Sequence, residues 1–324
     1  MNIYCQHCEI FTVLRNIKLY PHSDLSVLST PWSPTFTPSD MSHELWIDFH
    51  VLHTVNLSHA VFKDVKQVVI YDWFHAPEAV DPGHLQMIEK ISGAYPTKWI
   101  TTNYIFNSPV QTQRFDYLWN RCRSAYLEGK PTWKQSEPAN YQQWPLNWQP
   151  RSEKYLCMMN RPTTQRQRLL NLVKQFQGYY SDVSQGIILR PQQGSSLSST
   201  PPARSYWDQS YISCQVESMW RTGSAVTFTE KTYDHLIQGR LVLNFGPQGY
   251  YQVLAQDGWL CPRGVDLSWD SISNNELRFQ QYLQMLQDLL QRSDSDLHDL
   301  FLLNKDVIIH NYHRLREKPY DYVN

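Results

Sequence analysis

Three short segments of almost unbroken apolar and β-branched residues restrict the fold of this chain most strongly. They are Lys66–Tyr71 (KQVVIY), Lys154–Met159 (KYLCMM) and Leu241–Phe245 (LVLNF). Strands without polar alternation are buried on both faces, which is typical of parallel sheets covered by helices. Helical patterns lie between and after these segments, at Gly83–Ser92, Leu169–Phe176 and Glu276–Gln291. The pattern therefore predicts an α/β protein built from right-handed strand–helix–strand units.

The length of the chain, 324 residues, suits two domains of about 150 residues each. Gly129–Arg151 is rich in Pro, Gln, Trp and Tyr without apolar periodicity, which is typical of a linker. We therefore expect a first domain over residues 1–150 and a second over 151–295, followed by a C-terminal helix within 296–324 that packs back on the first. Pro191–Ser205 is of low complexity, and we expect a mobile loop there.

Charge and cysteine content argue against a strongly basic protein that binds nucleic acid or membranes and against a zinc finger. The net charge of −1 provides no global basic field that would steer the chain to nucleic acid or to an anionic membrane. Six cysteines are scattered without zinc-finger spacing, and Cys157 and Cys214 fall in apolar segments, so we expect them to be buried free thiols. No run of eighteen apolar residues occurs, and we expect a cytoplasmic protein without a membrane span.

The stretch Val216–Gly249 combines two predicted helix starts with a cation and carboxylates. Thr229 is a predicted N-cap, and Lys231 lies in the first turn, where the helix dipole disfavours a cation unless an anion is bound nearby. Glu230 can accept hydrogen bonds from sugar hydroxyls. Gly246 opens the Gly-Pro-Gln-Gly turn before the next helix, which is a second potential anion site. Capping alone also explains a Thr-Glu pair at a helix start.

A further candidate anion site follows the strand Lys154–Met159. Asn160 ends the strand, and Arg166 and Arg168 lie at the start of the next predicted helix. The planar guanidinium group suits phosphate oxygens. The alternative interpretation is a pair of solvated arginines on a surface helix.

Polar residues also follow the first-domain strand. Asp72, His75 and Glu78 come directly after Lys66–Tyr71, where open α/β sheets bind ligands at the carboxyl edge. We consider these three side chains as candidates for a general base, with an ordinary polar loop as the alternative.

The order of motifs in the second half resembles a known family. Val226–Thr232 (VTFTEKT), a helix ending near Gly239, an apolar strand and a Gly-Pro-x-Gly-Tyr turn are similar to the donor-binding half of fucosyltransferase-like and exostosin-like glycosyltransferases. The likeness is strongest to viral and bacterial relatives whose second domain carries a Thr-Glu-Lys signature. It covers roughly Lys154–Leu290.

The resemblance implies a GT-B-like fold of two Rossmann-like domains facing across a cleft. It implies an inverting, metal-independent glycosyltransferase that uses a nucleotide-diphosphate sugar as co-substrate, without a cofactor, and a carbohydrate or glycoconjugate acceptor. Asn160, Arg166, with Arg168 in reserve, and Lys231 are then expected near the diphosphate, and Glu217 or Glu230 on ribose or sugar hydroxyls. Thr229 and Gly246 complete the expected donor site, and Asp72, His75 or Glu78 is the expected base.

Two other functions and one metal motif stay open at this stage. The acceptor of the sugar could instead be a hydroxylated DNA base, or the chain could be a non-catalytic module that binds a sugar or nucleotide. Asp294-Ser295-Asp296 matches the D-x-D pattern of metal-dependent glycosyltransferases. Because it falls between two predicted helices, we interpret it as a turn and helix cap rather than a metal site.

Overall fold

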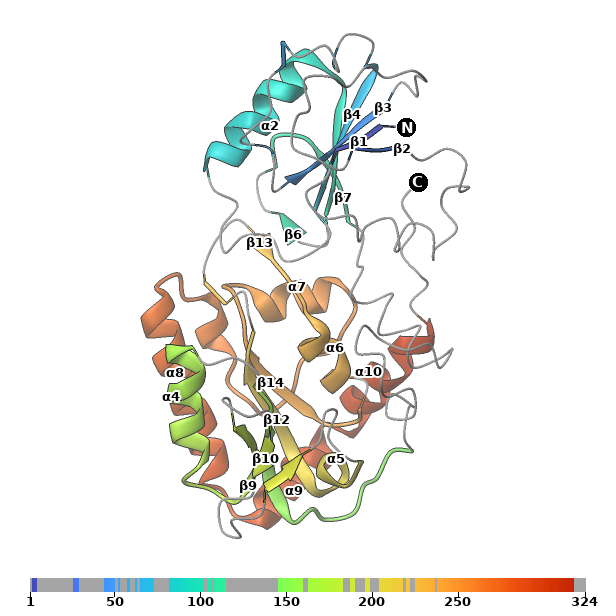
Figure 1. The fold of residues 1–324 in the computed structure, drawn as a ribbon. Helices are drawn as coiled ribbons and strands as arrows, with labels where there is room; N and C mark the ends of the chain where they lie inside the picture. The colour runs from blue at the N-terminus through green and yellow to red at the C-terminus, as the bar shows by residue number, and fades with distance from the viewer. Residues whose placement is uncertain are drawn as a thin grey trace. The chain divides into compact units, whose positions relative to one another are not determined.

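The computed structural model (Figure 1) describes 18 separate stretches of the chain. They are residues 2–4, 26–28, 44–49, 52, 57–58, 62, 65–72, 82–101, 104–105, 108–114, 145–159, 163–182, 187–189, 196–198, 204–217, 220–221, 225–236 and 238–317. The chain divides into two compact units. Unit 1 comprises Met1–Tyr117, Gly223–Thr227 and Tyr320–Asn324, and unit 2 comprises Leu118–Thr222 and Phe228–Pro319. In this grouping unit 2 begins at Leu118 rather than after residue 150, and the chain returns to unit 1 over Gly223–Thr227.

Unit 1 contains a parallel six-stranded sheet in the order β2-β1-β3-β4-β5-β7. Its strands are β1 (Asn2–Tyr4), β2 (Ser26–Leu28), β3 (Glu44–Asp48), β4 (Gln67–Asp72), β5 (Thr97–Thr101) and β7 (Gln111–Arg114). Helix α2 (Pro82–Ala94) buries Ile88 and Ile91 against Val68, Ile70 and Trp99 of the sheet. A separate two-stranded ladder joins β6 (Tyr104–Ile105) to β13 (Ala225–Val226). The predicted strand–helix–strand unit of this half is confirmed.

Unit 2 contains a second six-stranded sheet in the order β11-β10-β9-β8-β12-β14. Its strands are β8 (Glu153–Cys157), β9 (Gly178–Asp182), β10 (Ile187–Leu189), β11 (Ser196–Ser198), β12 (Ser210–Val216) and β14 (Leu241–Phe245). Strands β9, β8, β12 and β14 are parallel, and β10 and β11 add an antiparallel edge. The prediction of a loop over Pro191–Ser205 is wrong for Ser196–Ser198, which pair with β10 through backbone hydrogen bonds that composition does not report.

Helices cover both faces of the unit 2 sheet. Helices α4 (Thr164–Val173) and α8 (Asn275–Leu290) pack together on one face. On the other face, α6 (Glu230–Leu236) packs on β14 and contacts α10 (Lys305–Glu317) (Figure 1). Two short helices, α5 (Arg204–Gln209) and α7 (Tyr250–Gln256), precede β12 and follow β14. The buried thiols of Cys157 and Cys214 are free, as predicted. The expected α/β class with parallel sheets is therefore observed.

The end of the chain differs from the prediction of a single helix. Two helices are present, α9 (Asp294–Leu303) and α10 (Lys305–Glu317). Between them, buried Asn304 donates to Leu300 O and Arg263 O, which stabilises the break. Helix α10 contacts α6, and Asn311 donates to Leu260 O, so this segment packs within unit 2.

Candidate functional site

The order of the parallel strands in the unit 2 sheet changes direction between β8 and β12. In chain order the parallel strands are β8, β9, β12 and β14, whereas in space the order is β9-β8-β12-β14. The connection from β8 leads to one side, and the connection from β12 leads to the other. Ligands of open α/β sheets bind outside the carboxyl ends of strands at such a switch point. The candidate site of unit 2 therefore lies where β8 and β12 end.

Arg166 lies at this switch point. Its helix, α4, follows β8, and the hydroxyl of its N-cap Thr163 accepts from Arg166 N at 3.3 Å. The guanidinium group is buried and donates from Nε and Nη2 to Val216 O, the last carbonyl of β12, at 3.2 and 3.1 Å. The alternative of a solvated surface arginine is wrong for Arg166. Its side chain links the start of α4, the helix that follows β8, to the end of β12.

Arg168 faces a different neighbour. It forms an ion pair with Glu276 of α8, with 2.8 Å between Nη1 and Oε1, and its guanidinium lies 4.9 Å from the centre of the Phe279 ring. The two arginines considered for the diphosphate therefore diverge. Arg166 points to the end of β12, and Arg168 packs between α4 and α8.

A polar stripe, defined here as Ser213, Gln215 and Glu217, runs along the end of β12 and into the residue that directly follows it. The three side chains share one face of the strand because successive residues alternate in direction. All three are at most 1% exposed, whereas the opposite face carries apolar Cys214 and Val216. Gln215 is not among the residues predicted from the sequence. The alternation Ser-x-Gln-x-Glu in an otherwise apolar segment does indicate a polar face that includes it.

Glu217 is directed into the protein. Its Oε2 accepts from Thr229 Oγ1 at 2.6 Å, and its Oε1 accepts from the Thr232 hydroxyl, which also contacts the Tyr250 hydroxyl. The backbone N–H of Glu217 donates to Phe245 O at 2.8 Å, which joins the carboxyl ends of β12 and β14. The oxygens expected to bind ribose or sugar hydroxyls thus accept from the chain's own hydroxyl groups.

The predicted N-cap of α6 is confirmed. The helix begins at Glu230, whose backbone alone is described, and Thr229 Oγ1 accepts from Lys231 N at 3.2 Å. Thr229 O accepts from Thr232 N at 3.0 Å. Gln215 Nε2 donates to Lys231 O at 2.7 Å. The half-buried Lys231 is therefore held through its backbone from the strand below it.

The helix start after Gly246 is occupied by a carboxylate of the protein itself. Asp270 accepts from Tyr250 N at 3.1 Å and from Tyr251 N at 2.9 Å, which are the first N–H groups of α7. Burial raises the pKa of Asp270 to about 6, against the lowering effect of these hydrogen bonds. A Cβ on Gly246 would lie 2.3 Å from Tyr250 Cδ2, so the turn needs glycine. The predicted second anion site is thus already filled.

The remaining predicted residues are described in part or lie elsewhere. Asp72 ends β4 of unit 1, between β3 and β5, and only its backbone is described. The parallel strand order of unit 1 places its own switch point between β1 and β3. Asn160, His75 and Glu78 lie outside the described residues.

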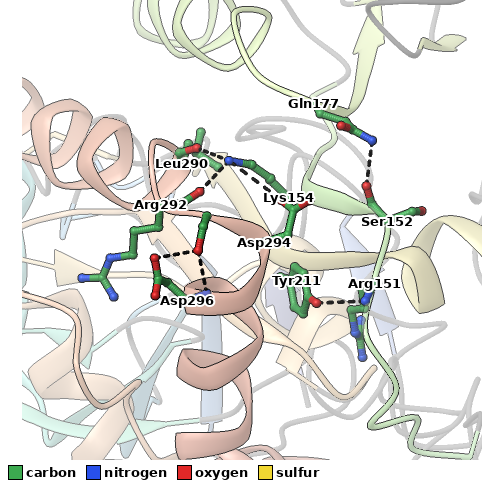
Figure 2. A network of polar contacts seen from close by, with 10 residues as sticks. Arg151, Ser152, Lys154, Gln177, Tyr211, Leu290, Arg292, Asp294 and Asp296 are labelled. Atoms are coloured by element: carbon green, nitrogen blue, oxygen red, sulfur yellow. Dashed lines mark hydrogen bonds and ion pairs between the residues drawn. The ribbon is translucent and has the colours of Figure 1, made fainter.

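The D-x-D segment forms the first turn of a helix, directly after the N-cap residue. Helix α9 begins at Asp294, and the hydroxyl of its N-cap Ser293 accepts from Asp296 N at 3.1 Å. Figure 2 shows this segment beside Lys154, whose Nζ donates to Leu290 O and Arg292 O at 2.9 and 2.6 Å. Lys154 belongs to the first half of β8, so this network lies at the amino edge of the sheet, away from the switch point.

No protein-family model matches the chain, and neither a curated protein nor a solved structure matches it at a significant level. Within the 18 described stretches, no three His, Cys, Asp or Glu residues are grouped in a way that could hold a metal ion. None of the helices in those stretches is both long and apolar enough to cross a membrane.

Proposed function

We propose that the protein is a glycosyltransferase that moves a sugar from a nucleotide-diphosphate donor to an acceptor hydroxyl. The observation that carries the proposal is the convergence of Arg166, Glu217, Thr229 and Lys231 at the carboxyl edge of a parallel sheet, beside its switch point. Nucleotides bind α/β sheets in this region. The Thr-Glu-Lys resemblance to fucosyltransferase-like and exostosin-like enzymes agrees with this location.

In the proposed reaction, the diphosphate leaving group lies against Lys231. Its ammonium group neutralises charge that develops as the bond to the anomeric carbon breaks, and Arg166 adds positive potential from the switch point. The acceptor hydroxyl attacks the anomeric carbon from the opposite side and inverts it. The proposal includes the GT-B arrangement, with a base from unit 1 among Asp72, His75 and Glu78, and a mechanism without a metal ion. A carbohydrate or glycoconjugate is the proposed acceptor.

Thermal unfolding in the presence of nucleotides tests the proposal. We expect one of UDP, GDP, dTDP or CMP, or its sugar conjugate, to raise Tm, since a ligand at a hundredfold excess over Kd stabilises the folded state by about 2.7 kcal/mol. Lys231→Ala should abolish the shift. Lys174→Ala removes an exposed lysine at the C-terminal end of a different helix, α4, and should retain the shift. A wild-type protein whose Tm responds to none of these compounds is not a nucleotide-sugar enzyme.

Turnover separates catalysis from binding. With the nucleotide sugar that raises Tm, we expect release of free nucleoside diphosphate, accelerated by a carbohydrate acceptor, and a loss of most of this rate in Lys231→Ala. A Tm shift without transfer or donor hydrolysis would instead identify a non-catalytic sugar- or nucleotide-binding module.

A further inference from the structure

We propose that Gln215 and Glu217 are positioning residues, which fix the first turn of α6 and thereby the location of Lys231. The inference rests on the proposed function only in taking Lys231 as the group that contacts the ligand. The residues it adds are buried, and they act through Lys231 rather than by contact with substrate.

The backbone N–H and C=O groups of Lys231 are both linked by hydrogen bonds to the end of β12. Its N–H donates to Thr229 Oγ1, and the same hydroxyl donates to Glu217 Oε2 at 2.6 Å. Its carbonyl accepts from Gln215 Nε2 at 2.7 Å. Gln215 lies in β12, and Glu217 follows the strand directly with its N–H bound to Phe245 O of β14, so the carboxyl end of one strand sets both contacts.

The donors and acceptors in this network can be assigned by starting from the carboxyl group of Glu217. Because both carboxylate oxygens of Glu217 accept, Thr229 and Thr232 each give it their only hydroxyl proton. Thr232 Oγ1 can then only accept from the Tyr250 hydroxyl. The network therefore ends at the carboxyl group of Glu217, beside the first turn of α6.

Stability alone does not explain a polar stripe at this position. Buried amide and carboxylate groups are costly to desolvate, and apolar side chains at the same positions pack without that cost. Gln215 is 1% exposed, and its Oε1 has no hydrogen-bond partner within the part of the chain that the structure describes. Among the described residues, its side chain makes one hydrogen bond, the donation to Lys231 O. The role of this buried amide is therefore to hold the helix turn rather than to stabilise the sheet.

Hydrogen exchange tests the positioning without any ligand. We expect Gln215→Met, Glu217→Gln and Thr229→Val to accelerate exchange of the first-turn amides of α6 about tenfold, because each weakens a contact that holds this turn. Thr229→Ser keeps the hydroxyl and should restore slow exchange. The control Gln284→Met replaces an exposed glutamine of α8 and should leave the exchange of α6 unchanged. Unchanged exchange in Gln215→Met and Thr229→Val would overturn the proposal.

In Gln215→Met, the affinity for nucleotide should fall without a fall in Tm. Loss of an incompletely paired buried amide should leave Tm unchanged or raise it, while affinity for the nucleoside diphosphate that stabilises the wild type should fall at least about tenfold. A purely structural glutamine would instead lower Tm and leave affinity unchanged. If the wild type binds no nucleotide but exchange accelerates as expected, the positioning stands and the proposed function fails. If the wild type binds and the variant binds equally well, the positioning fails alone.

Discussion

At the two edges of the unit 2 sheet, the helix termini are bound by side chains of opposite charge. At the carboxyl edge, the carboxylates of Glu217 and Asp270 accept from hydroxyls and N–H groups at the starts of α6 and α7. At the amino edge, Lys154, Arg151 and Arg240 donate to backbone carbonyls. In strand–helix–strand units the helices run opposite to the strands, so helix N-termini gather at one edge and C-termini at the other. Each edge therefore carries the counter-charge that the helix dipoles require.

Arg151 shows how much of the amino edge one cation can satisfy. Its Nη1 donates to Trp207 O at 2.8 Å and to Ser210 O at 2.6 Å, and its Nη2 reaches Asn147 O and Gly239 O. These carbonyls include the end of α5 and the turn after α6. Burial lowers the pKa of Arg151 to about 10, which still leaves it protonated at neutral pH.

A helix N-terminus at the edge of this sheet is therefore not by itself a ligand site. The sequence predicts phosphate contacts at the starts of α6 and α7. Instead, Glu217 accepts from the N-cap hydroxyl of α6, and Asp270 accepts from the first N–H groups of α7. The half-buried Lys231 is then the proposed ligand-facing cation of this edge, with the buried Arg166 behind it.

The largest expected effect is at the amino edge. Arg151→Ala should lower the free energy of unfolding by about 3 kcal/mol, because hydrogen bonds from charged groups contribute about 1.5–3 kcal/mol and their loss leaves buried carbonyls unpaired. Urea denaturation measures the change. The control Arg263→Ala removes an ion pair with Asp306 that is 55% and 61% exposed, and should cost less than about 1 kcal/mol. Equal urea midpoints for both variants would show that the buried arginine does not hold this edge.

The carboxyl edge should give the wild type a pH dependence that Asp270 controls. Because its pKa rises from 3.8 to about 6 on folding, the folded state binds the proton more tightly than the unfolded state. The contribution is therefore complete below about pH 4, and the free energy of unfolding should fall by about 3 kcal/mol as the pH rises to about 6 and above.

Asp270→Asn should remove this component, whereas Asp299→Asn, an exposed position on α9, should keep it. Urea denaturation of the three proteins between about pH 4 and 7 measures the slopes. Parallel curves for the wild type and Asp270→Asn would contradict the assignment of this titration to Asp270.

The smallest effects should separate carbonyl contacts from ion pairs at the amino edge. Lys154→Met removes two donations to the C-terminal carbonyls of α8 and should cost about 1 kcal/mol. Asp294 lies 4.0 Å from Lys154 Nζ and is 67% exposed, so Asp294→Ala should change stability by less than about 0.5 kcal/mol. A larger loss in Asp294→Ala than in Lys154→Met would mean that the ion pair, rather than the carbonyl contact, stabilises this corner.

Local pattern was sufficient for the features that depend on neighbours in sequence. The apolar strands β4, β8 and β14, the amphipathic helix α8 and the N-cap Thr229 follow from spacing and residue type alone. The cap on α7 could not be predicted in this way, because Asp270 reaches back 20 positions to Tyr250. The break at Asn304 likewise depends on a carbonyl 41 residues away, at Arg263. Arg166 was identified as a site residue, but its acceptor, Val216 O, was not.

The short ladder between β6 and β13 bears on how such a protein can change in evolution. β13 (Ala225–Val226) belongs to unit 1, although the chain on both sides of it belongs to unit 2. A single genetic crossover can therefore not exchange one unit without also replacing a strand of the other. The two units should be inherited together, and chimaeras made at one junction should need a matching change at Tyr104–Ile105 to restore the ladder.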